Sequence, residues 1–452
     1  MSSNRRWARL SVLACALIFV SFLITSPRPA QAVPSFARQT GQPCAACHTA
    51  FPELTPFGRR FKLSGYSLEG GTSSLPPVAA MIMQSYTHTE AKQDSAPDPG
   101  LKTNDNFVTQ QVTGFVAGKI YGDLGAFIQV TGNPVTGGFA IDASDIRYVK
   151  GFNLFGQDGF LGIDANNTPT VEDPWNTTNA FAFPEISSTV AAYSPPGTHI
   201  DALAQQVAGA GMYVFWDDMF YADFTAYGGL NQNTLEALGE NPGPTPDVQP
   251  TWMPYWRLAF EPHWGDNYLM VGTFGLYGET IPQGQYGIGT DKYLDIGVDS
   301  QYQYDGDKYS VTVKASNIYE VQKFDATYSQ MGSSNPKDWQ DNFKLNASYV
   351  WDHTYSLSAG YFNVTGSNDA ILNSAGVSGT PNGSGLVFDL AYLPFSHGST
   401  WLYSTYNARI GLQYTKYLQV YGGNNNFDGS GLGGTHNASG NNTLFLYAWL
   451  AF

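Results

Sequence analysis

The segment FKLNASYVW (343–351) alternates between apolar and polar side chains along its length. Successive side chains of a β-strand point to opposite faces, so such a strand has one apolar face and one polar face. From residue 76 onward we count about 16 segments of this kind, each long enough to cross the wall of a membrane barrel. The clearest of the others are YLDIGVDSQYQY (293–304), YSVTVKAS (309–316) and YNARIGLQYT (406–415). The pattern predicts an all-β chain.

The connections between these segments alternate in length. Short turns are expected at 121–125, 215–220, 263–268, 304–309 and 351–355, and longer polar loops at 88–104, 168–203, 230–251, 325–340, 367–383 and 421–440. Aromatic residues make up 15% of the chain, charged residues only 13%, and the last expected strand ends in Phe452. These features are typical of an antiparallel transmembrane β-barrel in the bacterial outer membrane, with its short turns in the periplasm. They disfavour a soluble β-sandwich.

The first 32 residues have the pattern of a secretory signal peptide. Arg5, Arg6 and Arg9 precede an apolar run at 10–24, and Ala30-Gln31-Ala32 forms a cleavage site. A twin-arginine signal and a lipoprotein box at 12–15 are the alternatives. No later apolar run approaches the roughly 20 residues of a membrane helix. The net charge of −15 excludes a basic surface for nucleic acid, and loss of the arginine-rich signal makes the chain more acidic.

The motif CAACH (44–48) places Cys44 and Cys47 directly before His48. This spacing is the attachment signature of c-type haem, in which both thiols bind the macrocycle and the histidine is the proximal iron ligand. A small disulfide or a thioredoxin-like redox pair are the alternatives, but no βαβ pattern surrounds the motif. Met81 and Met83 share one face of the first expected strand and are candidates for the distal ligand, or else packing residues.

Residues 33–75 around this motif form an irregular segment that is too short for a core of its own. One helix is expected within 54–63, with Thr55 as its N-cap and Pro56 at its first position. The segment contains four cations, Arg38, Arg59, Arg60 and Lys62. We expect them to pair with haem propionates or with acids of the barrel interior such as Asp295 and Asp299, or else to be solvated.

The stretch VPSFARQTGQPCAACHTAFPELTPFGRRFKLSGY (33–66) resembles the N-terminal region of the fused outer-membrane cytochrome–porins, a family known from iron-oxidising bacteria. The resemblance covers about a tenth of the chain in sequence, and the remainder in architecture only. It implies that the haem segment plugs the lumen of the barrel. It also implies that electrons pass from an extracellular donor, Fe(II) in the members best known by function, to a periplasmic carrier.

The sequence therefore predicts a signal peptide (1–32), a monohaem cytochrome c segment (33–75) and an outer-membrane barrel (76–452). The expected function is electron transport with iron oxidation, an Fe(II):cytochrome c oxidoreductase activity carried by one covalent haem c. The expected partners are outer-membrane lipid, a periplasmic c-type cytochrome and extracellular Fe(II) or another reductant. The alternatives are a passive porin with a structural or sensory haem segment, and outward electron transfer to an extracellular acceptor. A peroxidase needs a distal acid–base residue, which the motif does not place.

Overall fold

The computed structural model describes residues 34–71, 75–132, 134, 137–178, 182–240, 248–249, 251–282, 287–397, 406–430 and 436–452, so the expected signal peptide lies outside the described residues. The strands are β1 (Val78–Thr89), β2 (Asn106–Tyr121), β3 (Leu124–Gly132), β4 (Phe139–Leu154), β5 (Gln157–Asn166), β6 (Val207–Trp216), β7 (Phe220–Gly229), β8 (Trp252–Phe260), β9 (His263–Trp264), β10 (Asn267–Thr280), β11 (Asp291–Asp305), β12 (Tyr309–Lys323), β13 (Lys337–Trp351), β14 (Tyr355–Gly366), β15 (Gly383–Tyr392), β16 (Asn407–Gln419) and β17 (Thr443–Ala451).

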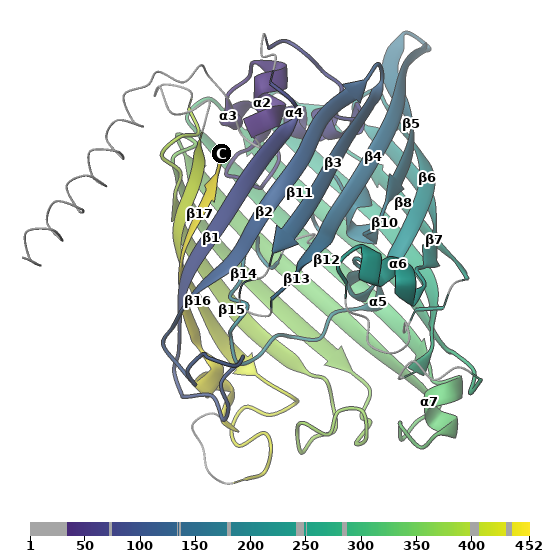
Figure 1. The fold of residues 1–452 in the computed structure, drawn as a ribbon, viewed down its shortest axis with the longest axis vertical. Coiled ribbons are helices and arrows are strands. Elements are labelled where there is room, and N and C mark those ends of the chain that lie inside the picture. Colours follow the sequence, from purple (N-terminus) through teal and green to yellow (C-terminus); the bar gives the residue numbers. More distant parts are fainter. Residues whose placement is uncertain are drawn as a thin grey trace, which may run out of the picture.

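These strands form one closed antiparallel barrel (Figure 1). Each strand pairs with its neighbours in sequence, and β1 closes the sheet against β17, with Met81 opposite Ala451 and Thr89 opposite Thr443. The short β9 continues the line of β8 along β10, so the wall has 16 strands. The predicted all-β antiparallel barrel and its strand number are confirmed.

The two faces of the wall differ as the alternation predicts. In β13, Leu345, Tyr349 and Trp351 are exposed on the outside, whereas Asn346 and Ser348 are buried on the inside. The same division recurs around the barrel, with outward apolar side chains such as Leu161, Ile163, Leu258, Ile296, Val298, Leu357, Leu390, Ile410, Leu412 and Leu446. A barrel with a polar interior and an apolar exterior is the arrangement of outer-membrane proteins.

The two ends of the barrel also differ. All the expected short turns lie at one end, and the expected long loops connect strands at the other. In Figure 1 the N-terminal helices and the C-terminus lie at the short-turn end, drawn at the top. Two connections depart from the rule, because 393–406 is long at the short-turn end and 133–138 is short at the opposite end. The loop expected at 325–340 ends earlier, since the alternation of β13 already begins at Lys337.

The connection between β5 and β6, described at residues 167–178 and 182–206, is not an external loop as expected but folds into the barrel. We call it the inner loop. Its backbone carbonyls accept hydrogen bonds from inward side chains of the wall, at 2.8 Å from Gln413 to Ile186 and 2.9 Å from the Tyr417 hydroxyl to Tyr193. Its apolar side chains, among them Trp175 and Ile200, are buried. The burial of this apolar surface is the physical reason that the loop turns inward.

The helices are short and lie at the ends of the barrel or inside it. They are α2 (Pro34–Thr40), α3 (Cys44–Cys47), α4 (Pro56–Leu63), α5 (His199–Ala202), α6 (Gln232–Ala237) and α7 (Asp325–Ser329), with 3₁₀ helices η1 (Pro169–Glu172) and η4 (Ala438–Asn441). The predicted cap of α4 is confirmed, since the Thr55 side chain accepts a hydrogen bond from the Gly58 amide at 3.1 Å. In the described part of the chain, no helix is long and apolar enough to cross a bilayer.

Candidate functional site

The CAACH motif lies on helix α3 and the residue that follows it. The His48 amide donates to the Cys44 carbonyl at 2.9 Å, which closes the single turn of α3. Helix α4 packs against this turn at Gly58, where a Cβ atom would lie only 2.2 Å from the Cys47 carbonyl oxygen. The Thr55 hydroxyl donates to the Ala46 carbonyl. The two helices therefore hold the motif rigidly.

The N-terminal segment (residues 34–71) contacts the inner wall of the barrel on several sides. The Tyr213 hydroxyl of β6 donates to the Leu63 carbonyl at 2.8 Å, and Arg409 of β16 donates to the Phe51 carbonyl at 2.7 Å. Glu53 is buried between β12 and β13, where its carboxylate lies 3.7 Å from the ammonium of Lys314. These contacts seat the segment between opposite parts of the wall.

One cation of this segment pairs with a buried acid of the barrel as expected, although not with the two acids given as examples. Arg59 is buried in an ion pair with Glu261 and donates to Gln303 at 2.7 Å. The expected partners are engaged elsewhere, because Asp299 pairs with Arg257 and Asp295 accepts a hydrogen bond from the amide of Ile200.

The remaining three cations also have protein partners. Arg60 pairs with Asp218 near the surface, Lys62 donates to the Val171 carbonyl, and Arg38 donates to the Val78 carbonyl. The expected pairing with a barrel acid is therefore confirmed for Arg59, but the two acids given as examples are not partners, because Arg257 and the inner loop engage Asp299 and the inner loop engages Asp295.

A cavity of about 550 Å³ lies between the N-terminal segment, the wall and the inner loop. We call it the His48 cavity. Both Cys47 and His48 line it, and most of its other walls are aromatic or apolar: Phe51, Phe61, Met81, Phe115, Phe127 and Trp449. The volume falls within the range of ordinary ligand pockets, which are mostly apolar with a few polar groups.

The His48 imidazole is held as a neutral ring by its surroundings. Its Nδ1 lies 3.2 Å from the carbonyl oxygen of Pro52, so Nδ1 carries the proton and Nε2 keeps its lone pair. Burial lowers the pKa of His48 to about 4, which keeps the ring neutral at pH 7. A carbonyl on one ring nitrogen is the usual support of a histidine that binds a metal through the other.

The two methionine candidates have different environments, although both are buried on the inner face of β1. Met81 lines the His48 cavity, and its sulfur accepts a hydrogen bond from the indole of Trp449. Met83 lies outside the lining, with its sulfur 3.1 Å from the amide nitrogen of Gln110. The structure thus brings Met81, and not Met83, to the cavity that holds His48.

No family model and no curated protein matches the chain. Solved structures match its fold. One is a loop-deletion mutant of the outer membrane protein OmpT of Vibrio cholerae, with 10% identity, a TM-score of 0.44, and coverage of 83% of this chain and 98% of that chain. Another is OmpF of Salmonella typhi in complex with daunomycin, with 11% identity, a TM-score of 0.47, and coverage of 83% and 97%. Such values concern the fold alone.

The residues around the motif fit a c-type haem. Cys44 and Cys47 are both thiols in the described structure, and burial raises the pKa of Cys47 to about 12. A thioether bond at each cysteine needs these thiols on one turn of chain, and an iron ligand needs the neighbouring imidazole nitrogen to be unprotonated. Both thiols lie on the single turn of α3, and the His48 cavity presents Cys47 and His48 among aromatic side chains, while Cys44 is buried behind its lining.

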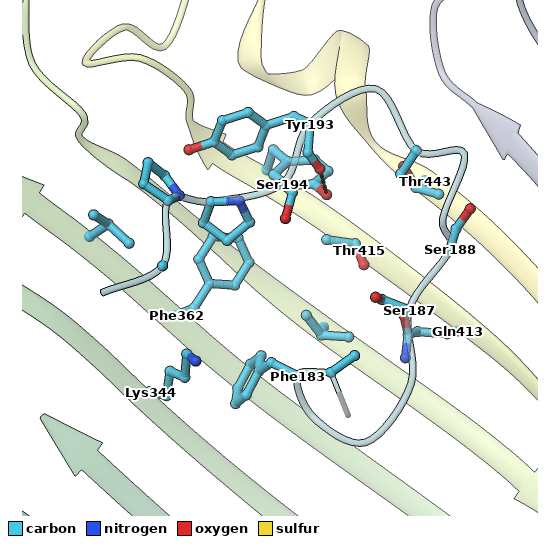
Figure 2. A pocket seen from close by; sticks show the side chains of 18 of the residues that line it. Phe183, Ser187, Ser188, Tyr193, Ser194, Lys344, Phe362, Gln413, Thr415 and Thr443 are labelled. Carbon is cyan, nitrogen blue, oxygen red and sulfur yellow. Dashed lines mark hydrogen bonds between the residues drawn. The ribbon is translucent and has the colours of Figure 1, made fainter. Parts of the chain in front are cut away.

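A second cavity of about 530 Å³ lies between the inner loop and the strands β13 to β17 (Figure 2). We call it the loop cavity. It has many hydroxyl groups in its lining, including Ser187, Ser188 and Thr415. Four residues line both cavities: Ala182, Phe183, Asp201 and Lys344. Figure 2 shows Phe183 and Lys344 at one edge of the loop cavity, which is where the two cavities adjoin.

Sequence reasoning missed the two contributors that complete the site. The aromatic wall comes from Phe115, Phe127 and Trp449, which are distant from the motif in sequence. The inner loop contributes Val171, Asp173 and Phe183 to the His48 cavity. The signal that could have suggested an inward path is a match of charge between distant segments, acids such as Glu185 in 168–203 and cations such as Lys314 within an expected strand.

Proposed function

We propose that this chain is an outer-membrane electron conduit that takes electrons from an extracellular donor, Fe(II), and passes them to a periplasmic c-type cytochrome. The observation that carries the proposal is the His48 cavity. It brings Cys47 of the attachment motif, a neutral imidazole and a thioether sulfur into one largely aromatic pocket inside a barrel. This arrangement serves electron transfer, whereas a channel for solutes has no need of it.

The outer face of the barrel supports a location in the outer membrane. Aromatic pairs lie on the exposed face next to the short turns, for example Tyr309 with Tyr349 at 5.7 Å and Tyr355 with Tyr392 at 5.4 Å between ring centroids. Tyrosine and tryptophan at the ends of an apolar band favour the lipid–water interface. We therefore infer that lipid covers the band and that the end with the N-terminal segment faces the periplasm.

The residues of the site have separate roles in this proposal. A bound c-type haem supplies a one-electron centre. Cys44 and Cys47 would hold it covalently, and His48 would bind its iron through Nε2 while the Pro52 carbonyl keeps the ring oriented. Met81 is the residue that would offer a thioether sulfur to the iron, which would raise the reduction potential. The aromatic lining excludes water around these groups.

The loop cavity offers a small donor a place beside the site. The loop cavity adjoins the His48 cavity at Phe183 and Lys344, so a solute in the loop cavity lies next to the site. Each Fe(II) that reaches this junction would lose one electron and leave as Fe(III). The same electron would leave toward a carrier docked at the short-turn end, where the N-terminal segment lies.

The experiment that tests the proposal mixes anaerobic Fe(II) with the oxidised, haem-loaded protein in detergent and follows the visible spectrum by stopped flow. We expect rapid appearance of the reduced spectrum in the wild type and its loss in His48→Ala. His88→Ala is the matched control, since His88 is an exposed residue that pairs with Asp105. Protein that dithionite reduces but Fe(II) does not would exclude iron as the donor. Protein without covalent haem would overturn the proposal.

A passive porin is the second candidate, and the closed barrel with a polar interior favours it. The two candidates differ in ion flow. A conduit whose N-terminal segment is seated between opposite walls should conduct little in a planar bilayer, whereas a porin should conduct steadily. Removal of Cys44 and Cys47 together should leave the conductance of a porin unchanged, because only a conduit depends on the haem.

A further inference from the structure

Three buried carboxylates lie together outside the His48 cavity. They belong to Asp164 of β5, Glu172 of η1 and Asp223 of β7, so two come from the wall and one from the inner loop. One oxygen of each carboxylate lies within 4.8 Å of the others. The three residues are only 2%, 0% and 4% exposed, so no bulk water solvates their charges. Such a grouping is costly unless a cation lies within it or protons neutralise it.

The hydrogen bonds of the protein do not satisfy this cluster. Glu172 accepts from Arg147 at 2.9 Å and from Asn166. Asp223 has only long contacts with the Thr225 hydroxyl, at 3.3 and 3.5 Å. Both oxygens of Asp164 are buried, and no side-chain or backbone donor among the described residues satisfies them; the polar group within reach is the Glu172 carboxyl itself. A buried carboxylate without a donor, directed at two further carboxylates, is the donor set of a cation site unless a proton is shared between them.

The residues around the cluster do not supply enough positive charge to balance it. Arg147 is the one cation that forms an ion pair with the three carboxylates in the described part of the chain, and it also pairs with Asp145. Arg257, the other buried arginine nearby, is engaged by Asp173 and Asp299. Lys62 adds one positive charge close by, through its contact with the Val171 carbonyl. If all are ionised, the six carboxylates named here face three cations, so the negative charge exceeds the positive charge unless a bound cation or protons balance it.

We propose that Asp164, Glu172 and Asp223 bind one divalent cation inside the barrel. Carboxylate oxygens alone select hard cations such as Mg²⁺, Ca²⁺ or Mn²⁺ rather than ions that prefer sulfur or imidazole. The site ties η1 of the inner loop to the wall strands β5 and β7. It adjoins the His48 cavity, because Val171 and Asp173, which flank Glu172 in the chain, both line that cavity. The inference does not depend on the proposed electron transfer.

Binding of Mn²⁺ to the full-length protein tests the inference. The purified protein in detergent is stripped with a chelator, passed through a desalting column and titrated with Mn²⁺, and the free ion is measured by electron paramagnetic resonance. We expect one tightly bound Mn²⁺ per chain. Asp164→Asn should weaken binding by about 10- to 100-fold or more, since even indirect support of a metal ligand is worth that much. Asp218→Asn, at the exposed partner of Arg60, should bind like the wild type.

Two outcomes would overturn the inference. One is a wild-type protein that binds no Mn²⁺ beyond the level of Asp164→Asn, which would mean that the carboxylates share protons instead. The other is a bound ion that Asp164→Asn and Asp223→Asn both leave in place. Should Asp164→Asn fail to fold, as judged by its migration on unheated gels, the wild-type stoichiometry and Asp223→Asn still decide the matter.

Discussion

The ion pair between Arg59 and Glu261 should hold the N-terminal segment in the barrel. Arg59 is 2% exposed, and its guanidinium also donates to Gln303 at 2.7 Å and to the Leu54 carbonyl at 3.1 Å. Arg59→Ala would leave Glu261 buried and charged without its partner. Breaking a buried pair in this way costs about 3–5 kcal/mol. A cost of about 4 kcal/mol shifts the equilibrium between seated and released segment by roughly a thousandfold.

Hydrogen exchange of helix α4 measures this shift directly. We expect the exchange of its amides to accelerate by roughly a thousandfold in Arg59→Ala if exchange requires release of the segment. Ion conductance in planar bilayers should rise at the same time. Arg60→Ala is the matched control, because its pair with Asp218 is partly exposed and worth about 1 kcal/mol at most.

A double variant separates the ion pair from lost packing. Arg59→Met combined with Glu261→Gln removes both charges, so it should be less damaging than Arg59→Ala alone. Equal exchange rates in the wild type, Arg59→Ala and Arg60→Ala would refute the reasoning, since the buried pair would then contribute nothing to seating.

Three further predictions concern the site and the inner loop. In haem-loaded protein, Met81→Ala should lower the reduction potential by part of the roughly 0.8 V range that axial ligands span, whereas Met83→Ala should leave it unchanged; redox titration decides. Gly58→Ala should lower the free energy of unfolding by about 1–3 kcal/mol, because its Cβ would lie 2.2 Å from the backbone oxygen at the end of α3. Gly114→Ala places its Cβ in open space and should be neutral; thermal unfolding of both variants measures the difference. Burial lowers the pKa of His199 from 6.5 to about 4, so the unfolded loop takes up a proton more readily than the folded loop. The free energy of unfolding the loop should therefore fall by roughly 3 kcal/mol as the pH falls from 6.5 to 4. Proteolysis of the inner loop should rise over that window in the wild type and not in His199→Phe; identical pH profiles would contradict this.

The site shows how far a local pattern reaches. The motif from Cys44 to His48 and the capped helix after it are readable because they depend on residues within a few positions of one another. The partner of Arg59 was not readable, since Glu261, Asp295 and Asp299 are equally acidic in the sequence. Which of them meets Arg59 depends on the stagger of the strands and on the position of the inner loop.

The sequence by itself determined the barrel. Alternation has a period of two residues, so each strand shows which side chains face out, and the turn lengths show which end is which. Only the tertiary structure decided what fills the barrel. Met81 and Met83 lie on the same face of one strand, yet Met81 alone reaches the His48 cavity, beside a Trp449 from the opposite end of the chain. The lumen brings together residues that are remote in sequence, and their contacts follow from strand tilt, closure and the inward path of residues 167–206, which no local pattern encodes.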